Sequence, residues 1–273
     1  MPELPDLTVV AEELQARATG RIVLNATAPT PILVRATPAE LAELAGTTLR
    51  RARRRGKFLL LDFARDDVDI RVLAANPMLA GRFWLLERGG DRVRARTGLR
   101  IRFEDGGELR YVDREMLGKL YLVRPDAIDG IPGWTEMGPD ADDLAFTLDR
   151  FRERIRRHPG ELKSLLRNSR FVAGIGNAYS DEILWEAQLA PLRRRSTLQP
   201  PEIDRLYAAM RSVLEEATVR LRALVPPDIH LQHREFLKVH LRGGEPCPRC
   251  GRLLRQIGGD EATTFCRTCQ PPA

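Results

Sequence analysis

The chain has 273 residues, of which 43% are hydrophobic and 30% charged, and its formal net charge is +6. This length allows two domains of ordinary size, each with its own core. No apolar run approaches the ~20 residues of a membrane span and no secretory signal precedes the first predicted helix, so we expect a cytoplasmic protein without membrane partners.

The first candidate site is the amino terminus. If Met1 is removed, Pro2 carries a free secondary amine that can attack an aldehyde-level carbon and form an iminium ion. An apolar stripe predicts a helix from about Asp6, and the positive end of its dipole would favour the unprotonated amine. Glu3 lies within reach as a proton donor or acceptor. The alternative is that Pro2 only permits removal of Met1 and that Glu3 is a solvated charge.

Short runs rich in Val, Leu, Ile and Phe follow this helix, separated by turn signals. They predict strands at 21–26, 32–35, 58–63, 69–73, 82–86, 99–103, 108–112 and 119–123, with a short helix at 38–44. This spacing favours a β-sandwich or a pair of barrel-like sheets. We therefore predict an N-terminal domain at 1–123 with a two-layer antiparallel β-sandwich and flanking helices.

The arginines gather in three groups, at 50–57, 152–157 and 193–195. Such clusters attract a polyanion, most simply nucleic acid. They are equally typical of a solvated, arginine-rich surface, so charge alone leaves both interpretations open.

Residues 124–139 are rich in proline and glycine and are predicted to link two domains. Beyond them, helical periodicity predicts helices at 144–157, 161–168, 177–187 and 202–224, within a domain at 140–242.

A glycine-rich turn lies between two of these helices. Gly174 and Gly176 permit tight turns, and Asn177 is expected to cap the next helix. The free N–H groups at such a helix start form a phosphate site, and Lys163 and Arg167 on the preceding helix could hold neighbouring phosphates.

All four cysteines lie in the C-terminal segment 243–273, as Cys247-Pro-Arg-Cys250 and Cys266-Arg-Thr-Cys269. This spacing indicates one tetrahedral, structural Zn²⁺ ion that folds a small hairpin. Two disulfides are the alternative, which the absence of a secretory signal disfavours.

These motifs together resemble the formamidopyrimidine-DNA glycosylase / endonuclease VIII family over essentially the whole chain. Residues 2–5 match its N-terminal catalytic signature and 55–58 match the segment that holds its catalytic lysine. Residues 174–182 match its helix–two-turn–helix element and 244–270 match its zinc hairpin. The resemblance implies an α+β fold with a sandwich domain, a C-terminal helix–two-turn–helix domain and a zinc hairpin.

The family resemblance also implies a chemistry. The chain would be a base-excision-repair DNA glycosylase with AP lyase activity, a monomer associated with the bacterial nucleoid, acting on double-stranded DNA with damaged bases or abasic sites. Pro2 would form a Schiff base with C1′ of a flipped damaged nucleotide, Glu3 would be the general acid–base, and Lys57 would assist transfer and elimination. Met78 and Leu79 would fill the gap left in the stack, unless they are core residues.

Two positions depart from the family pattern. Glu115 stands where the family has an arginine facing the orphaned base, with Leu117 in place of the aromatic wedge, and Glu261 stands where an arginine binds phosphates and aids δ-elimination. The segment 225–242 is also shorter than the loop that closes over the base in 8-oxoguanine-specific members. These differences favour oxidised pyrimidines or bulkier adducts as substrates and leave open whether elimination is β or β,δ.

Two other functions remain as alternatives. A catalytically reduced relative could recognise lesions or abasic sites without excision, although the joint presence of Pro2, Glu3 and Lys57 argues against it. A zinc-ribbon transcription accessory protein would explain the cysteines and the charge but not the amino terminus.

Overall fold

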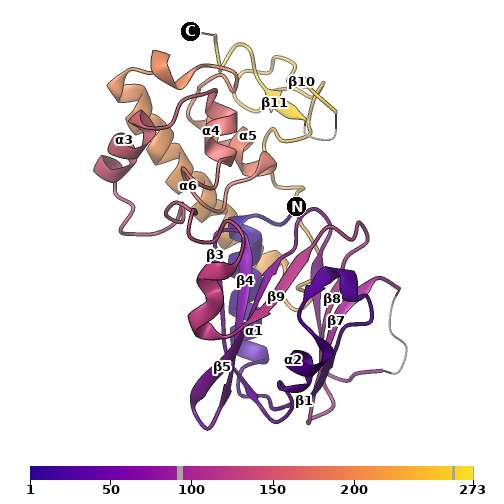
Figure 1. The fold of residues 1–273 in the computed structure, drawn as a ribbon. Helices are drawn as coiled ribbons and strands as arrows, with labels where there is room; N and C mark the ends of the chain where they lie inside the picture. Colours follow the sequence, from indigo (N-terminus) through magenta and orange to yellow (C-terminus); the bar gives the residue numbers. More distant parts are fainter. Residues whose placement is uncertain (91–94, 260–261, 273) are drawn as a thin grey trace. The chain divides into compact units, whose positions relative to one another are not determined.

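The computed structural model describes residues 1–90, 95–259 and 262–272 (Figure 1). The chain forms two compact units, one of Met1–Thr135 with Arg220–His233 and the other of Glu136–Val219 with Arg234–Ala273. The first unit therefore includes a segment, Arg220–His233, that the sequence pattern places in the helical domain. Within the described residues, no helix combines the length and apolar character needed to cross a bilayer.

Two β-sheets form the body of the first unit, beside helix α1 (Leu4–Arg17) (Figure 1). Their strands are β1 (Val23–Thr27), β2 (Val34–Arg35), β3 (Thr48–Arg55), β4 (Phe58–Arg65), β5 (Val68–Asn76), β6 (Arg82–Leu86), β7 (Thr97–Phe103), β8 (Glu108–Val112) and β9 (Lys119–Val123). One sheet has the order β2-β9-β5-β4-β3 and the other β1-β7-β8-β6. Their pairings are antiparallel apart from the short parallel pair β2–β9, which confirms the predicted α+β fold with antiparallel N-terminal sheets.

Strand β3 runs through the first arginine cluster and was not predicted from the sequence. Its apolar positions Leu49 and Ala52 are buried, whereas Arg50 and Arg51 are exposed. β3 pairs with the almost entirely buried β4, in a register that places Ala52 opposite Leu61. The buried apolar positions are three residues apart because the register shifts between Leu49 and Arg51, so β3 lacks the alternation on which a strand prediction depends.

Other elements differ from the predictions mainly at their ends. α1 begins at Leu4 rather than near Asp6, because proline is tolerated in the first helical turn and Glu3 takes the N-cap position. The predicted strand at 32–35 is divided between a 3₁₀ turn, η1 (Pro31–Leu33), and strand β2, while the predicted short helix is α2 (Pro38–Ala42). The predicted linker contains the 3₁₀ helix η2 (Pro125–Gly130).

The second unit is helical and ends in a small hairpin. Its elements are α3 (Leu148–Arg156), α4 (Leu162–Arg167), α5 (Asn177–Glu186), η3 (Arg195–Thr197), most of α6 (Pro200–Leu224), β10 (Arg255–Ile257) and β11 (Thr263–Phe265). Phe151 is fully buried and its ring packs against Phe146, Phe171 and Tyr207. This aromatic cluster anchors α3 and α6 to the segment that precedes the glycine turn.

Candidate active site and zinc centre

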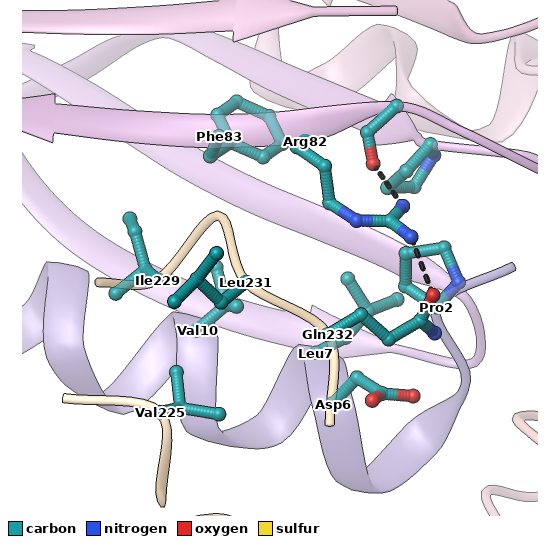
Figure 2. Close-up of a pocket in the computed structure, with 12 residues that line it drawn as sticks. Pro2, Asp6, Leu7, Val10, Arg82, Phe83, Val225, Ile229, Leu231 and Gln232 are labelled. Atoms are coloured by element: carbon teal, nitrogen blue, oxygen red, sulfur yellow. Dashed lines mark hydrogen bonds between the residues drawn. The ribbon is translucent and has the colours of Figure 1, made fainter. Parts of the chain in front are cut away.

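Pro2 lies in the wall of a pocket in the first unit (Figure 2). The wall is mostly apolar and is formed by Leu7 and Val10 of α1, Phe83 of β6, and Val225, Ile229 and Leu231 of the segment after α6. Pro2 itself is buried, with Met1 still attached. The residue whose amine the sequence singles out is therefore held by packing.

The start of α1 fixes the residues around Pro2. Glu3 is the N-cap and is 2% exposed, and its backbone N–H donates to Oδ2 of Asp6 at 2.8 Å. Asp6 acts as a first-turn carboxylate that reaches back to the cap. Pro2 thus immediately precedes the N-cap of a helix, where the dipole disfavours a protonated amine.

Lys57 lies at the tip of the β3–β4 hairpin. Gly56 precedes it with φ +55, a left-handed conformation that glycine adopts without strain. Arg54 holds this tip: its Nη1 donates to the Gly56 carbonyl at 3.1 Å, and its Nε donates to Oγ1 of Thr8 on α1 at 3.0 Å. One arginine therefore connects the lysine-bearing turn to the helix that follows Pro2.

A glutamine that the sequence did not indicate also reaches the amino terminus. Nη2 of Arg82, on β6, donates to Oε1 of Gln232 at 2.5 Å (Figure 2). Nε2 of Gln232 donates to the carbonyl oxygen of Met1 at 3.2 Å. Gln232 lies in a stretch without periodicity, so no sequence signal relates it to Pro2.

The segment that carries Gln232 packs against other parts of the first unit. Val225 and Ile229 are 4% and 3% exposed, and the His230 ring stacks on Trp84 with centroids 3.4 Å apart and planes 18° from parallel. The sequence predicts that a segment this short makes no tight lid. The structure shows that it nevertheless supplies part of the pocket wall.

The two predicted wedge residues differ in exposure. Leu79 is 53% exposed, whereas Met78 is half-buried with φ +50, and its N–H donates to Oδ1 of Asn76 at 3.2 Å. The structure thus makes Leu79 the more accessible of the pair.

The loop after β8 presents further apolar side chains. Met116 and Leu117 are 38% and 46% exposed, and Glu115 is exposed beside them. Buried Asp113 shapes this loop by accepting the N–H of Glu115 at 3.1 Å and that of Gly118 at 2.6 Å. Exposed apolar side chains on a rigidly held loop suit insertion between bases, and Met116 was not predicted to do this. Glu261, the other departure from the family pattern, lies outside the described residues.

Lys163 is buried, which the sequence did not indicate. Its Nζ lies 2.6 Å from Oδ1 of Asp181 and donates to the carbonyl oxygen of Ala262 at 3.0 Å. Oδ2 of Asp181 lies 2.8 Å from Nδ1 of His240. Lys163 therefore joins α4, α5 and the hairpin within the second unit, and its contact with a DNA phosphate stays a prediction.

Asn177 is the first residue of α5, and Gly176 rather than Asn177 takes the N-cap position. The Asn177 amide donates to the Ala262 carbonyl at 2.9 Å, while its Oδ1 is buried without a hydrogen-bond partner among the described residues. Arg167 is half-buried in the last turn of α4. Asn177 therefore lies at a helix start, whose backbone N–H groups suit a phosphate, and the contacts of Asn177 and Arg167 with DNA stay predictions.

The four cysteines converge in the hairpin. Their sulfur atoms all lie within 4.8 Å of one another, with Cys247 and Cys269 at 3.9 Å and Cys250 and Cys266 at 3.5 Å. Zn–S bonds of about 2.3 Å in a tetrahedron give sulfur separations near 3.8 Å, so the cluster fits one zinc ion with no open position.

Trp185 of α5 helps to lower the pKa of one of these thiols. Burial acts against ionisation of Cys247, but the Trp185 indole N–H, 3.4 Å from its sulfur, and two backbone N–H groups outweigh it and lower the pKa of Cys247 to about 6. This favours the thiolate that binds metal.

Three family models match the chain from end to end. They are the formamidopyrimidine-DNA glycosylase N-terminal domain at residues 1–120, the H2TH domain of the same enzyme at 137–223, and a zinc finger found in FPG and IleRS at 244–272. A formamidopyrimidine-DNA glycosylase of Pelotomaculum thermopropionicum is 33% identical over 99% of both chains. The chain belongs to the formamidopyrimidine-DNA glycosylase family.

Solved structures of this family have the same fold as this chain. Lactococcus lactis Fpg in complex with DNA containing N7-benzyl-Fapy-dG has a TM-score of 0.88 at 27% identity and covers 99% of this chain and 100% of its own. The same enzyme with abasic-site DNA gives 0.87 at 27% identity, covering 98% and 99%. Membership confirms the resemblance drawn from the motifs, and this glycosylase chain is an enzyme of base-excision repair with a structural zinc site.

Proposed function

We propose that this chain is a bifunctional DNA glycosylase and AP lyase whose nucleophile is the amine of Pro2 after loss of Met1. The observation that carries the proposal is the setting of Pro2, buried in a pocket wall immediately before the N-cap Glu3. A secondary amine held beside a carboxyl group and a helix start has the components for iminium chemistry.

In the proposed reaction, these groups act in sequence. The lone pair of the Pro2 nitrogen forms a bond to C1′ as the base leaves with the electrons of its glycosidic bond, and Glu3 supplies a proton. Opening of the sugar ring gives an iminium ion, which acidifies C2′. Loss of a C2′ proton then expels the 3′ phosphate and cuts the strand. Lys57, on its hairpin tip, assists proton transfer and binds phosphate.

Double-stranded DNA with a damaged base or an abasic site is the proposed partner. Its support is the family itself, whose solved relatives are complexes with such DNA. Asn177, Arg167 and Lys163 are the proposed phosphate contacts of the second unit. We propose that Leu79 and Met78 enter the stack where the nucleotide has left it, and that the protein acts as a monomer.

The preferred lesion is proposed to be an oxidised pyrimidine or a bulkier adduct rather than 8-oxoguanine. Glu115 and Leu117 at the exposed loop support this preference, since neither can make the contacts that an arginine and an aromatic ring make with the orphaned base. A panel of duplexes, each with one lesion, measures the single-turnover excision rate. If 8-oxoguanine opposite cytosine is the fastest substrate, the preference is wrong.

The proposed nucleophile is tested by borohydride trapping on abasic-site DNA, with loss of Met1 verified by mass spectrometry. Wild-type protein is expected to give a covalent adduct that is absent from Pro2→Gly. If the processed wild type gives no adduct but binds the DNA, the catalytically reduced relative is the correct reading. Functional protein that retains Met1 would likewise end the assignment of Pro2.

A further inference from the structure

The Gln232 side chain makes a hydrogen bond directly beside the Pro2 nitrogen. In the unprocessed chain, the carbonyl carbon of Met1 is the atom bonded to the Pro2 nitrogen. In the proposed reaction, which this inference rests on, C1′ of the nucleotide takes that same place. The Met1 oxygen therefore stands in for a heteroatom attached to C1′, and Nε2 of Gln232 donates to it at 3.2 Å.

The orientation of the Gln232 amide follows from its two partners. The Arg82 guanidinium has only donors, so the group that faces it at 2.5 Å is the amide oxygen. The Met1 carbonyl is only an acceptor, so the group that faces it is the amide nitrogen. Arg82 (Figure 2) thus turns the N–H of Gln232 towards the Met1 oxygen, which is attached to the carbon bonded to the proline nitrogen.

The contact between Arg82 and Gln232 is held by residues other than Met1. The segment is anchored by buried Ile229 and by the stacking of His230 on Trp84. The Arg82 head group is in turn fixed by donating from Nη1 to the Gly81 carbonyl at 2.7 Å. After removal of Met1, we expect the Gln232 donor to face the space that the heteroatom attached to C1′ would occupy.

We infer that Gln232, oriented by Arg82, donates a hydrogen bond to the heteroatom that leaves C1′ when Pro2 attacks. As the nitrogen–carbon bond forms, the bond from C1′ to the leaving heteroatom breaks and its electron pair goes to that heteroatom. The neutral amide stabilises the growing negative charge through its N–H but gives up no proton, which comes from Glu3 or water. A fixed donor of this kind acts mainly on the transition state, because the charge is greatest there.

Two variants separate the donor from the packing. Gln232→Met keeps the length of the side chain but has no N–H, and Gln232→Glu keeps the shape but places an acceptor at the same position. In processed protein, both are expected to slow single-turnover excision and trapping by about 100-fold, the usual cost of one such donor. Affinity for a duplex with a tetrahydrofuran abasic analogue, which cannot react, is expected to stay within about twofold.

Arg82→Met tests the orienting contact. Because it acts through Gln232, Arg82→Met combined with Gln232→Met is expected to be little slower than Gln232→Met alone. Gln199→Ala, an exposed glutamine in the other unit, is the matched control and is expected to react at the wild-type rate.

The outcomes are distinct. Wild-type rates in Gln232→Met would overturn the inference, as would a loss of tetrahydrofuran-DNA affinity that accounts for the whole rate change. If instead Pro2→Gly still forms the adduct at full rate, the proposed function fails, whatever the Gln232 variants do.

Discussion

Lys57 illustrates how a single charged side chain is positioned by its neighbours. The left-handed Gly56 makes the tight turn, and Arg54 holds that turn to Thr8 of α1. The lysine therefore occupies a defined place near the start of α1.

We expect Lys57→Met to slow base excision by about 100-fold, in the range typical of one general acid–base group. The trapped adduct on pre-formed abasic DNA is expected to fall less, because no base has to leave. Both rates are measured under single-turnover conditions. Arg65→Met, at the opposite end of β4, controls for loss of one positive charge; equal losses in the two variants would contradict a specific role for Lys57.

At the level of single residues, the sequence predicts candidate reacting groups but not the contacts that hold them in place. Pro2, Glu3 and the cysteines are identified by residue type and spacing. The burial of Lys163 against Asp181 and the reach of Gln232 to Met1 join residues far apart in the chain. Local periodicity carries no information about such contacts, so only the folded structure reveals them.

Among the elements, β8 carries a buried charge cluster in its sheet. Glu108 is fully buried and accepts from Nε of Arg100 at 3.0 Å and from Nε of Arg110 at 2.6 Å. Burial raises the pKa of Glu108, but the two arginines outweigh it and hold the pKa below its ordinary value of 4.5. Removing one partner of such a cluster leaves the others buried without compensation.

The Glu108 cluster predicts a dependence of stability on pH. The unfolded carboxyl binds a proton more readily than the folded one, so the stabilisation is fully present above pH 4.5 and is lost as pH falls through the lowered folded pKa. Glu108→Gln is expected to cost about 3 kcal/mol at pH 7 and to lose less stability than wild type on acidification. Urea unfolding at pH 7 and below pH 4.5 measures the free energy of unfolding of both proteins, with exposed Glu104→Gln as control. Parallel pH profiles for Glu108→Gln and wild type would refute it.

The zinc hairpin is the element with the least core of its own, since every residue of β10 is exposed. Its order comes from the four thiolates and from a small cluster in which Trp185 packs with Cys247, Leu254 and Cys266. Metal binding in such a hairpin contributes directly to folding.

We expect a strong chelator to unfold the hairpin while the sheets of the first unit remain folded. Trp185 would then lose its buried surroundings, and its fluorescence would shift to longer wavelength. Cys266→Ser should reproduce the shift without chelator, and added zinc should reverse it only in the chelated wild type. An unchanged emission spectrum after verified zinc loss would contradict the prediction.

Across the whole molecule, some of the basic side chains pair with carboxylates of the protein itself and are not available to a DNA partner. Several arginines of the predicted clusters form ion pairs inside their own units, among them Arg53 with Asp62, Arg152 with Asp204 and Arg193 with Glu202. These pairs show that the number of arginines overstates the number available to DNA. The sequence predicted the fold class because strands and helices have local signatures, whereas the uses of the arginines depend on partners brought together by folding.

DNA affinity is therefore expected to depend on salt less steeply than the arginine count suggests. Each phosphate contact contributes about −0.9 to the slope of log K against log salt concentration. We expect Asn177→Ala, which removes no charge, to weaken binding with an unchanged slope, and Arg167→Met to reduce the slope by about one. Fluorescence anisotropy with a tetrahydrofuran duplex from low to physiological salt gives both values, and an unchanged slope in Arg167→Met would exclude that phosphate contact.

The buried place of Pro2 has a practical consequence for anyone who prepares this enzyme. Under the proposed mechanism, an affinity tag fused to the amino end turns the Pro2 nitrogen into an amide, which has no basic lone pair, so the purified protein is expected to be inert even when it is folded. Inactivity is therefore informative only in preparations whose first residue has been identified as proline.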